Sequence, residues 1–309
     1  MPEGDLSAGT LRDDFVRPFL LEIPGLRGRL VRLGALVDLI LGRHDYPEPV
    51  AALLGELVAL SAALSSTLKF DGIFTLQTKG DGPVRMMVAD VTSGGELRAY
   101  AEVDADKLAE VWEEGAAARP SATALLGQGY LAFTVDQGDN TERYQGIVEL
   151  EGDSLAEIVQ HYFRQSEQFN AAIRLAAGRA EGAWRAGALI LQQLPEEGEE
   201  WLGSGEEDDW RRNVVLMSSC RDHELLDPAL SADQLLYRLF HEERVRVYEA
   251  RLLHEGCRCS RERIESVLRS LPEEDLEYMK VDGELVVTCQ FCNIDYRFSE
   301  QSIDDIRAR

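Results

Sequence analysis

The chain has 309 residues, of which 45% are hydrophobic and 28% charged, a balance typical of a soluble globular protein with one large and one small domain. Its formal charge of −24 at pH 7 repels nucleic-acid phosphate, and no run of Lys and Arg suggests a local basic patch. The composition therefore argues against a nucleic-acid partner.

The N-terminal residues and one apolar stretch bear on where the protein resides. Residues 1–6 lack the basic and apolar regions of a signal peptide. Residues 49–68 carry a single charge, Glu56, over nearly the length of a membrane span, but that charge lies mid-segment and Lys69 follows directly. We interpret this stretch as a buried core helix and expect a cytoplasmic protein without a membrane partner.

Residues 1–194 predict the mixed α/β core domain of an α+β protein with antiparallel hairpins. In chain order, we expect a strand at 26–33, helices at 35–41 and 49–68, a hairpin of 72–77 with 84–88, a strand at 97–103, a second hairpin of 130–135 with 143–150, a helix at 154–169 and a strand at 188–194. Asp153 is the predicted N-cap of the last helix. Strands and helices do not alternate regularly, so a parallel doubly wound sheet is not expected.

The composition changes over residues 195–213, where acidic residues and glycines are concentrated. We expect Gly198, Gly203 and Gly205 to break any helix there. The apolar anchors are Trp201, Leu202 and Trp210. Like-charge repulsion and few apolar groups predict a linker of low local stability that docks loosely on a neighbour. After it, residues 231–243 predict a helix and residues 245–248 a short strand.

Five cysteines in a chain expected to be cytoplasmic do not indicate a disulfide scaffold. Four of them form the pattern Cys257-x-Cys259, a gap of 29 residues, and Cys289-x-x-Cys292. The second pair falls at the turn of a hairpin predicted for residues 284–288 and 294–298, where two sulfurs converge on one point. Because four thiolates suit tetrahedral zinc, we predict that these cysteines bind one Zn²⁺ per chain.

The gap between the two pairs predicts two short helices. Ser260 can cap the first, and Pro272 ends it and begins the second. Residues 251–309 then form a module with too little core to be stable alone, for which zinc would supply on the order of 10 kcal/mol. Four thiolates and one Zn²⁺ sum to a charge of −2. Nearby arginines that would offset this charge and favour ionised thiols are Arg258, Arg261 and Arg263.

Two other interpretations of the cysteines were weighed against a redox switch. A permanent structural zinc site is the commonest use of four cysteines and stays open. A thioredoxin-like active site is disfavoured because strands flank the second pair on both sides. Oxidation of neighbours spaced this closely would give two local disulfides, Cys257–Cys259 and Cys289–Cys292, which leave the two pairs unconnected. Oxidation would thus release zinc and unfold the module, so the spacing is compatible with a redox switch.

Motifs of enzymes are not found in the sequence. It contains no Gly-x-x-x-x-Gly-Lys-Ser/Thr loop for ATP and no Gly-x-Ser-x-Gly elbow. The scattered histidines, which we interpret as structural, are His44, His161, His223, His241 and His254. We expect no catalytic activity and interpret Cys220 as a buried, inert thiol. A zinc-containing protein-interaction module without redox switching is the alternative function.

Motifs along almost the whole chain resemble those of the heat shock protein 33 family. They are His44-Asp-Tyr-Pro47, Leu68-Lys-Phe-Asp-Gly72, Gly80-Asp-Gly-Pro83, Glu142-Arg-Tyr-Gln-Gly146, Glu151-Gly-Asp-Ser-Leu155, Tyr162-Phe with Ser166-Glu-Gln168, His241-Glu-Glu243 and the cysteine pattern itself. No single motif would suffice, but their order and spacing together are specific.

The resemblance implies a redox-regulated, ATP-independent holdase chaperone that is inactive when reduced and zinc-bound. Oxidation of Cys257, Cys259, Cys289 and Cys292, aided by mild heat, is expected to release zinc and expose surface that binds unfolding client proteins. Family members can dimerise when active and release clients to an ATP-driven foldase. The resemblance also implies a core domain at 1–194, a metastable helical linker at 195–230 and a C-terminal redox-switch zinc domain at 231–309.

Overall fold

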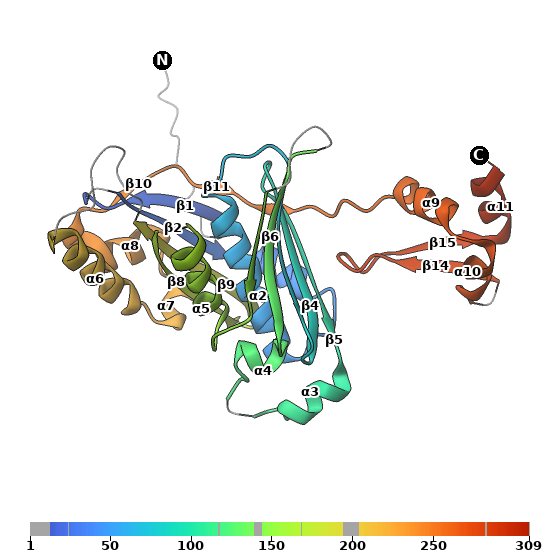
Figure 1. Cartoon of the computed structure of the whole chain (residues 1–309), viewed down its shortest axis with the longest axis horizontal. Coiled ribbons are helices and arrows are strands. Elements are labelled where there is room, and N and C mark those ends of the chain that lie inside the picture. The colour runs from blue at the N-terminus through green and yellow to red at the C-terminus, as the bar shows by residue number, and fades with distance from the viewer. Residues whose placement is uncertain are drawn as a thin grey trace, which may run out of the picture. The chain divides into compact units, whose positions relative to one another are not determined.

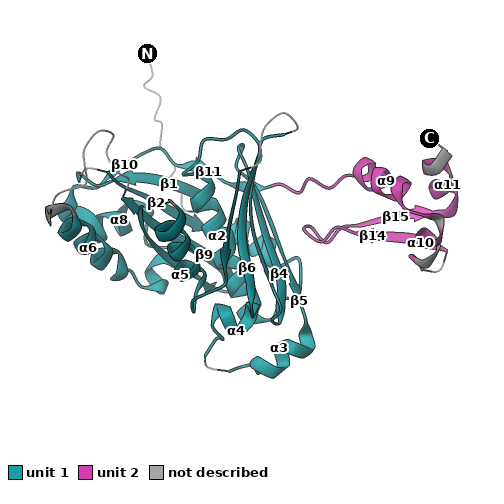
Figure 2. Cartoon of the chain, viewed as in Figure 1, with its two compact units in different colours: residues 1–255 teal, residues 256–309 magenta. Residues whose placement is uncertain are grey.

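The computed structural model describes residues 13–23, 25–116, 118–138, 144–167, 169–193, 204–281 and 283–308. The chain divides into two compact units, Met1–Glu255 and Gly256–Arg309, which Figure 2 shows in different colours. Both combine helices with antiparallel strands (Figure 1), so the predicted α+β class is confirmed. The three-part division into residues 1–194, 195–230 and 231–309 stays a prediction.

The first of two six-stranded sheets in the larger unit has the order β10-β1-β2-β9-β8, with β11 also paired to β1. Its strands are β1 (Phe15–Leu20), β2 (Leu26–Leu33), β8 (Asn170–Ala180), β9 (Ala183–Gln193), β10 (Arg246–Val247) and β11 (Arg251–Leu252). The β8–β9 hairpin turns at Glu181 and Gly182, whose φ angles of 54° and 88° suit a type I′ turn. The sequence did not predict β8, because its many alanines carry no strand-like alternation.

The second sheet has the order β12-β5-β4-β3-β6-β7 and is antiparallel except for the β12–β5 pair. Its strands are β3 (Ile73–Gly80), β4 (Val84–Thr92), β5 (Glu96–Val103), β6 (Gly129–Asp136), β7 (Tyr144–Glu149) and β12 (His254–Glu255). Both predicted hairpins are confirmed, as β3 with β4 and as β6 with β7. Pairing of β3 with β6 joins the two hairpins into one sheet.

The apolar stretch near residue 49 forms α2 (Glu48–Ser65), which follows α1 (Ala35–Leu41) and contacts strands of both sheets. It is long and apolar enough to cross a membrane, but 89% of it is buried inside the protein, as the sequence analysis expected. Gly55 lets the helix approach β8 closely, because a Cβ there would lie 2.9 Å from the Cβ of Ala177. Burial raises the pKa of Glu56 in the same helix to about 7.

Helices cover the face of the first sheet that points away from α2. They are α6 (Ser204–Ser218), α7 (Asp222–Leu226) and α8 (Ala232–Phe240), and the 3₁₀ turn η2 (His241–Glu243) follows α8. The expectation that Gly205 breaks a helix is wrong, because Gly205 lies in the first turn of α6, where the N–H groups have no partner within the helix in any case. Residues 195–203, with their glycines and tryptophan, lie outside the described residues. Cys220 is buried as predicted, and burial raises the pKa of its thiol to about 11.

The remaining helices of the larger unit are α3 (Ala105–Val111), α4 (Ala122–Leu126), α5 (Leu155–Tyr162) and the π-helical turn η1 (Phe163–Glu167). The N-cap of α5 is Ser154 and not Asp153, because the Ser154 hydroxyl accepts a hydrogen bond from the Glu157 N–H at 3.2 Å. The helix predicted to reach residue 169 is also too long. Its α-helical part ends at Tyr162, and the chain enters β8 soon after the π-helical turn.

Two buried arginines of the first sheet hold the connection between α7 and α8. Arg32 is 1% exposed and donates hydrogen bonds to the carbonyl oxygens of Asp227 and, at 2.8 Å, Leu230. Arg185 donates to the Leu226 carbonyl at 2.6 Å. The carboxylate of Asp13 pairs with both guanidinium groups and so balances their charge. The segment from 226 to 230 is thus fixed to the sheet by charge-assisted hydrogen bonds.

The smaller unit has a three-stranded antiparallel sheet in the order β13-β14-β15. Its elements are α9 (Arg261–Ser270), α10 (Glu273–Tyr278), β13 (Lys280–Val281), β14 (Glu284–Thr288), β15 (Asp295–Ser299) and α11 (Glu300–Ala308). The hairpin and both helices predicted here are confirmed, whereas α11 was not predicted. The buried apolar cluster consists of Leu268, Leu276, Leu285, Phe298, Ile303 and Ile306. This core is small for an independently stable domain.

We predict that Arg32→Ala destabilises the larger unit by about 3 kcal/mol, because the carbonyl groups of residues 227 and 230 lose their donor and Asp13 loses a partner. Urea unfolding followed by circular dichroism measures the change. The control is Arg85→Ala, which removes an exposed ion pair with Asp104 and should leave the unfolding midpoint in place. Equal midpoints for the two variants would contradict the role assigned to Arg32.

Candidate metal centre

Two short stretches of the smaller unit carry the cysteines. Cys257 and Cys259 lie just before α9, whose N-cap Ser260 accepts a hydrogen bond from the Arg263 N–H at 3.3 Å. Cys289 and Cys292 lie in the turn that joins β14 to β15, as predicted. The helix cap and the hairpin therefore fix the backbone on both sides of the cysteines.

The turn that carries the second pair depends on a left-handed residue. The N–H of Asn293 donates to the Cys289 carbonyl at 2.8 Å, and the N–H of Cys289 donates to the Ile294 carbonyl at 3.0 Å. Asn293 has a φ angle of 56°, a conformation that asparagine tolerates better than most residues. These bonds curl the chain so that Cys289 and Cys292 face the same point.

The structure brings all four sulfurs together. The Sγ atom of Cys257 lies 3.3 Å from that of Cys259 and 3.7 Å from that of Cys289, and the Sγ atoms of Cys259 and Cys292 are 3.4 Å apart. All four lie within 4.8 Å of one another. Zn–S bonds of about 2.3 Å in a tetrahedron place sulfurs about 3.8 Å apart. The donor set and its spacing therefore fit one zinc ion.

The thiols differ in how readily they ionise. Burial alone would raise the pKa of Cys257, but the Cys259 N–H and the neighbouring thiols outweigh it and lower the value to about 7. Burial raises the pKa of Cys259, and burial together with the adjacent sulfurs raises that of Cys292 much further. In the absence of metal, the first thiolate thus discourages ionisation of its neighbours. A cation among the sulfurs would reverse this preference.

A tyrosine hydroxyl also contacts the cluster. Tyr296 donates a hydrogen bond to Cys259 Sγ at 3.2 Å, and this bond raises the pKa of the tyrosine to about 12. The sequence placed Tyr296 only within the second strand of the predicted hairpin, residues 294–298, and gave it no role at the cysteines. The register of the hairpin could have predicted that Tyr296 lies near the cysteines, because it pairs Tyr296 with Val287, two residues before Cys289. Hydrogen bonds to the sulfurs of a metal site tune ligand basicity.

Two of the arginines expected to offset the thiolate charge make contacts that brace the backbone. The Arg261 guanidinium lies 4.3 Å from the centre of the Phe298 ring and donates to the Arg297 carbonyl at 3.2 Å. Arg263 donates to the Arg258 carbonyl at 2.6 Å. These contacts connect α9 to β15 and to the first cysteine stretch. Their electrostatic role at the thiolates stays a prediction.

Comparisons with known proteins identify relatives over nearly the whole chain. A family model described as Hsp33 protein matches residues 14–299. The chain is 43% identical over 290 residues to a protein of Caulobacter vibrioides named 33 kDa chaperonin, covering 92% of this chain and 94% of that one. It is 35% identical over 295 residues to the 33 kDa chaperonin of Escherichia coli, covering 95% of each.

One solved structure shows the same fold. It is the crystal structure of a 33 kDa chaperonin, a heat shock protein 33 homologue, from Thermotoga maritima. The TM-score is 0.77 and the identity 23%, and the match covers 96% of this chain and 98% of that one. The elements of both units therefore recur in a distant relative.

We predict that Asn293→Val lowers metal affinity of the reduced protein about 10-fold, because a β-branched residue strains the left-handed turn that aims Cys289 and Cys292. Asn293→Gly, which adopts the same conformation without strain, should bind metal as the unchanged protein does. Competition for Co²⁺ with a chromophoric chelator measures both affinities. Equal losses in the two variants would show that the turn conformation does not matter.

A second prediction concerns the metal-free, reduced protein. Cys257 should be the first of the four thiols to be alkylated by iodoacetamide, since its pKa of about 7 leaves a substantial thiolate fraction at pH 7.5. Its rate should fall as the pH drops from 7.5 to 6, because the thiolate is then protonated. Cys292 should react last. Peptide mass spectrometry after timed quenching gives the order, and uniform rates would contradict it.

Proposed function

The chain belongs to the Hsp33 family, as its motifs predicted, and from this premise we propose that it is a redox-regulated, ATP-independent chaperone that holds unfolding proteins. The observation that carries the proposal is the convergence of Cys257, Cys259, Cys289 and Cys292 on a point that fits one zinc ion. When bound, Zn²⁺ would keep the four sulfurs as thiolates and crosslink two pairs that are 29 residues apart in sequence. In this reduced form the chaperone is inactive.

Oxidation changes what the sulfurs can bind. Each pair of thiolates gives up two electrons and forms one S–S bond, while one molecule of hydrogen peroxide is reduced to two hydroxide ions. Two peroxides thus convert the four ligands into the disulfides Cys257–Cys259 and Cys289–Cys292. Disulfide sulfurs are poor zinc ligands, so the ion is released.

Whether the smaller unit unfolds after oxidation depends on which cysteines pair in the disulfides. Local disulfides close loops of a few residues and constrain little of the chain. The sulfurs of Cys257 and Cys289, at 3.7 Å, and of Cys259 and Cys292, at 3.4 Å, are about as close as those of Cys257 and Cys259, at 3.3 Å. Disulfides formed across the pairs would preserve the long-range link and leave the smaller unit folded. The proposed switch therefore requires the local pairing.

The small apolar cluster of the cysteine-bearing unit supports unfolding after metal loss. In the larger unit, α6 and α7 contact β8 and β9, whose apolar residues in the same buried cluster include Ala176, Leu189 and Leu191. Release of the linker, which we place at residues 195–230, would expose this surface to unfolded client proteins. The net charge of −24 would keep such complexes soluble. We further propose a cytoplasmic protein without catalytic activity that dimerises when oxidised and passes clients to an ATP-driven foldase.

We predict that peroxide at mildly raised temperature releases one zinc per chain and suppresses aggregation of a thermolabile client protein, and that reductant reverses both effects. A zinc-sensitive dye and light scattering measure the two quantities in one sample. Cys220→Ser should behave like the unchanged protein. The Cys220 thiol is buried, its pKa of about 11 keeps it protonated at neutral pH, and it is not one of the four clustered cysteines. Equal protection by reduced and oxidised protein would instead favour the alternative, a permanent structural zinc site.

Two further measurements locate the switch. Mass spectrometry of the oxidised protein should find the local disulfides, and dominant pairing across the gap would exclude the proposed mechanism. Cys289→Ser removes one ligand and should weaken zinc binding and favour the unfolded, active form without oxidant. If this variant stays folded and inactive, the smaller unit does not depend on zinc for its stability.

A further inference from the structure

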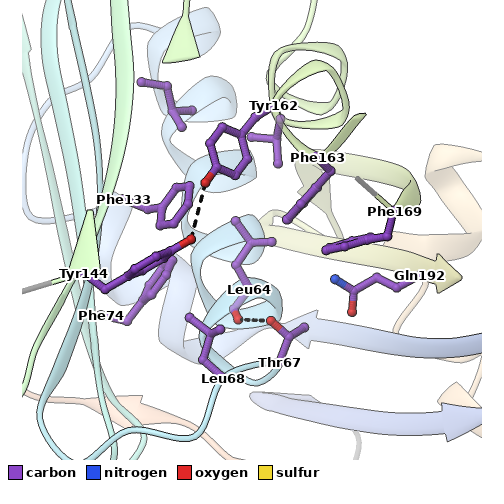
Figure 3. Close-up of a pocket in the computed structure, with 12 residues that line it drawn as sticks. Leu64, Thr67, Leu68, Phe74, Phe133, Tyr144, Tyr162, Phe163, Phe169 and Gln192 are labelled. Carbon is purple, nitrogen blue, oxygen red and sulfur yellow. Dashed lines mark hydrogen bonds between the residues drawn. The ribbon is translucent and has the colours of Figure 1, made fainter. Parts of the chain in front are cut away.

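A cavity of about 200 Å³ lies in the larger unit, between the end of α2, strands of the second sheet and the turn η1 that follows α5 (Figure 3). Half of the twelve residues that line it are aromatic. They are Phe74, Phe133, Tyr144, Tyr162, Phe163 and Phe169. The proposed redox switch makes no use of this cavity.

The walls are held in place by specific packing. Phe133 and Tyr162 meet edge to face, with ring centres 4.9 Å apart at 85°. Gly146 makes this contact possible, because a Cβ there would lie 2.2 Å from Phe133 Cζ and 2.7 Å from the Tyr162 hydroxyl. Phe163 begins the π-helical turn η1, a feature frequent at functional sites, and its ring centre lies 5.0 Å from that of Phe169. The cavity is therefore shaped by a glycine and an irregular helix end.

One wall carries a buried amide. Gln192 in β9 is 7% exposed, and Figure 3 shows its amide turned toward the interior of the cavity. Among the residues that the structure describes, no partner for this amide is found. The amide atoms are accessible from the cavity, so a ligand with a complementary group can hydrogen-bond to them. The Thr67 hydroxyl, which donates to the Leu64 carbonyl at 2.7 Å, leaves its oxygen available as a second acceptor.

Segments singled out in the sequence meet at this place. Leu68, Tyr144 and Tyr162 each come from a different motif among those that carry the family resemblance, and all three line the cavity. The hydroxyl groups of Tyr144 and Tyr162 face each other at 3.5 Å (Figure 3). Motifs distant in sequence thus converge on one apolar cavity with few polar groups, which is the usual composition of a small-ligand site.

We propose that this cavity binds a single aromatic ring system that carries a hydrogen-bonding group, the chemistry shared by phenol, indole and the side chains of tyrosine and tryptophan. An apolar cavity of about 150 Å³ accepts benzene, so about 200 Å³ accommodates phenol or indole. The aromatic walls contact the faces and edges of the ring, and the Gln192 amide binds its hydroxyl or N–H group. The site is complete in the reduced protein and independent of the cysteines.

The test uses the reduced, full-length protein and two probes of equal size, 4-fluorophenol and 4-fluorotoluene, followed by ¹⁹F NMR. Both should bind saturably, and the phenol at least about fivefold more tightly, because only its hydroxyl can bind the amide. Gln192→Leu should abolish this preference while keeping toluene binding. No saturable binding of either probe, or an unchanged preference in Gln192→Leu, would overturn the proposal.

Gln193→Leu is the matched control, since it makes the same change one residue along β9, where the side chain accepts a hydrogen bond from Asn170 on the other face of the sheet. It should keep the preference for the phenol. Val159→Phe should fill the cavity and lose both probes, while far-ultraviolet circular dichroism shows that the variant folds. Undiminished binding by folded Val159→Phe would also overturn the proposal.

The natural ligand could be an aromatic side chain of an unfolded protein or a free aromatic compound, and competition with 4-fluorophenol distinguishes these two sources. An unstructured peptide with one tryptophan should displace 4-fluorophenol if the natural ligand is a side chain of an unfolded segment, whereas the same peptide with alanine should not. Displacement by free indole but not by the tryptophan peptide would assign the site to a free aromatic compound. Both results support an aromatic-ring site. Failure of the redox test above would leave this binding unchanged.

Discussion

The smaller unit depends on how four sulfurs within 4.8 Å of one another are satisfied. Thiols packed this closely gain little from each other, and burial opposes ionisation of Cys259. Two chemical states resolve the conflict, namely thiolates around a cation and oxidised disulfides. The first connects chain segments 29 residues apart, whereas the local disulfides Cys257–Cys259 and Cys289–Cys292 do not. Because the apolar core of the unit is small, the proposed switch makes the choice between these states a choice between a folded and an unfolded unit.

In the larger unit, the connection between α7 and α8 is held by charge-assisted hydrogen bonds and not by sulfur. Arg32 and Arg185 bind carbonyl oxygens between α7 and α8, and Asp13 balances their charge. No oxidant alters these groups, and their buried charge makes partial detachment costly. In contrast, α6 begins among acidic residues and contributes few buried side chains, such as Met217. Burial and charge-assisted hydrogen bonds thus increase along the chain from α6 toward the segment that the arginines bind.

Much of the fold could be predicted from the sequence wherever a local pattern is decisive. Hairpins with strong alternation and turn residues, the apolar helix α2 and the paired cysteines were all found, because spacing alone carries their signal. The alanine-rich strand β8 was missed because its partner β9 and not its composition makes it a strand. Helix α6 was missed because contacts with the first sheet outweigh unfavourable charge and glycine.

The candidate site was predicted as a set of ligands but not as a geometry. The type and spacing of four cysteines predict a metal site. The hydrogen bond of the Tyr296 hydroxyl and the left-handed conformation of Asn293 depend instead on how the hairpin folds. The aromatic cavity was not predicted at all. Its walls come from residues between 64 and 192, and a single glycine opposite Phe133 decides whether they can meet. Such features follow from long-range packing, which one sequence without its fold does not reveal.

The chain that leads to the cysteines explains how the two units can affect each other through covalent continuity alone. Strands β10 and β11 pair with β1, and β12 pairs with β5, so residues 246–255 contact both sheets of the larger unit. Each of these strands has two residues and is held by few hydrogen bonds, supplemented by Arg251, which donates to the carbonyls of Thr92 and Ser93. Short edge strands open at low cost. The proposed unfolding of the smaller unit would add chain entropy directly beside β12, so the β12–β5 pair at the edge of the second sheet would weaken first.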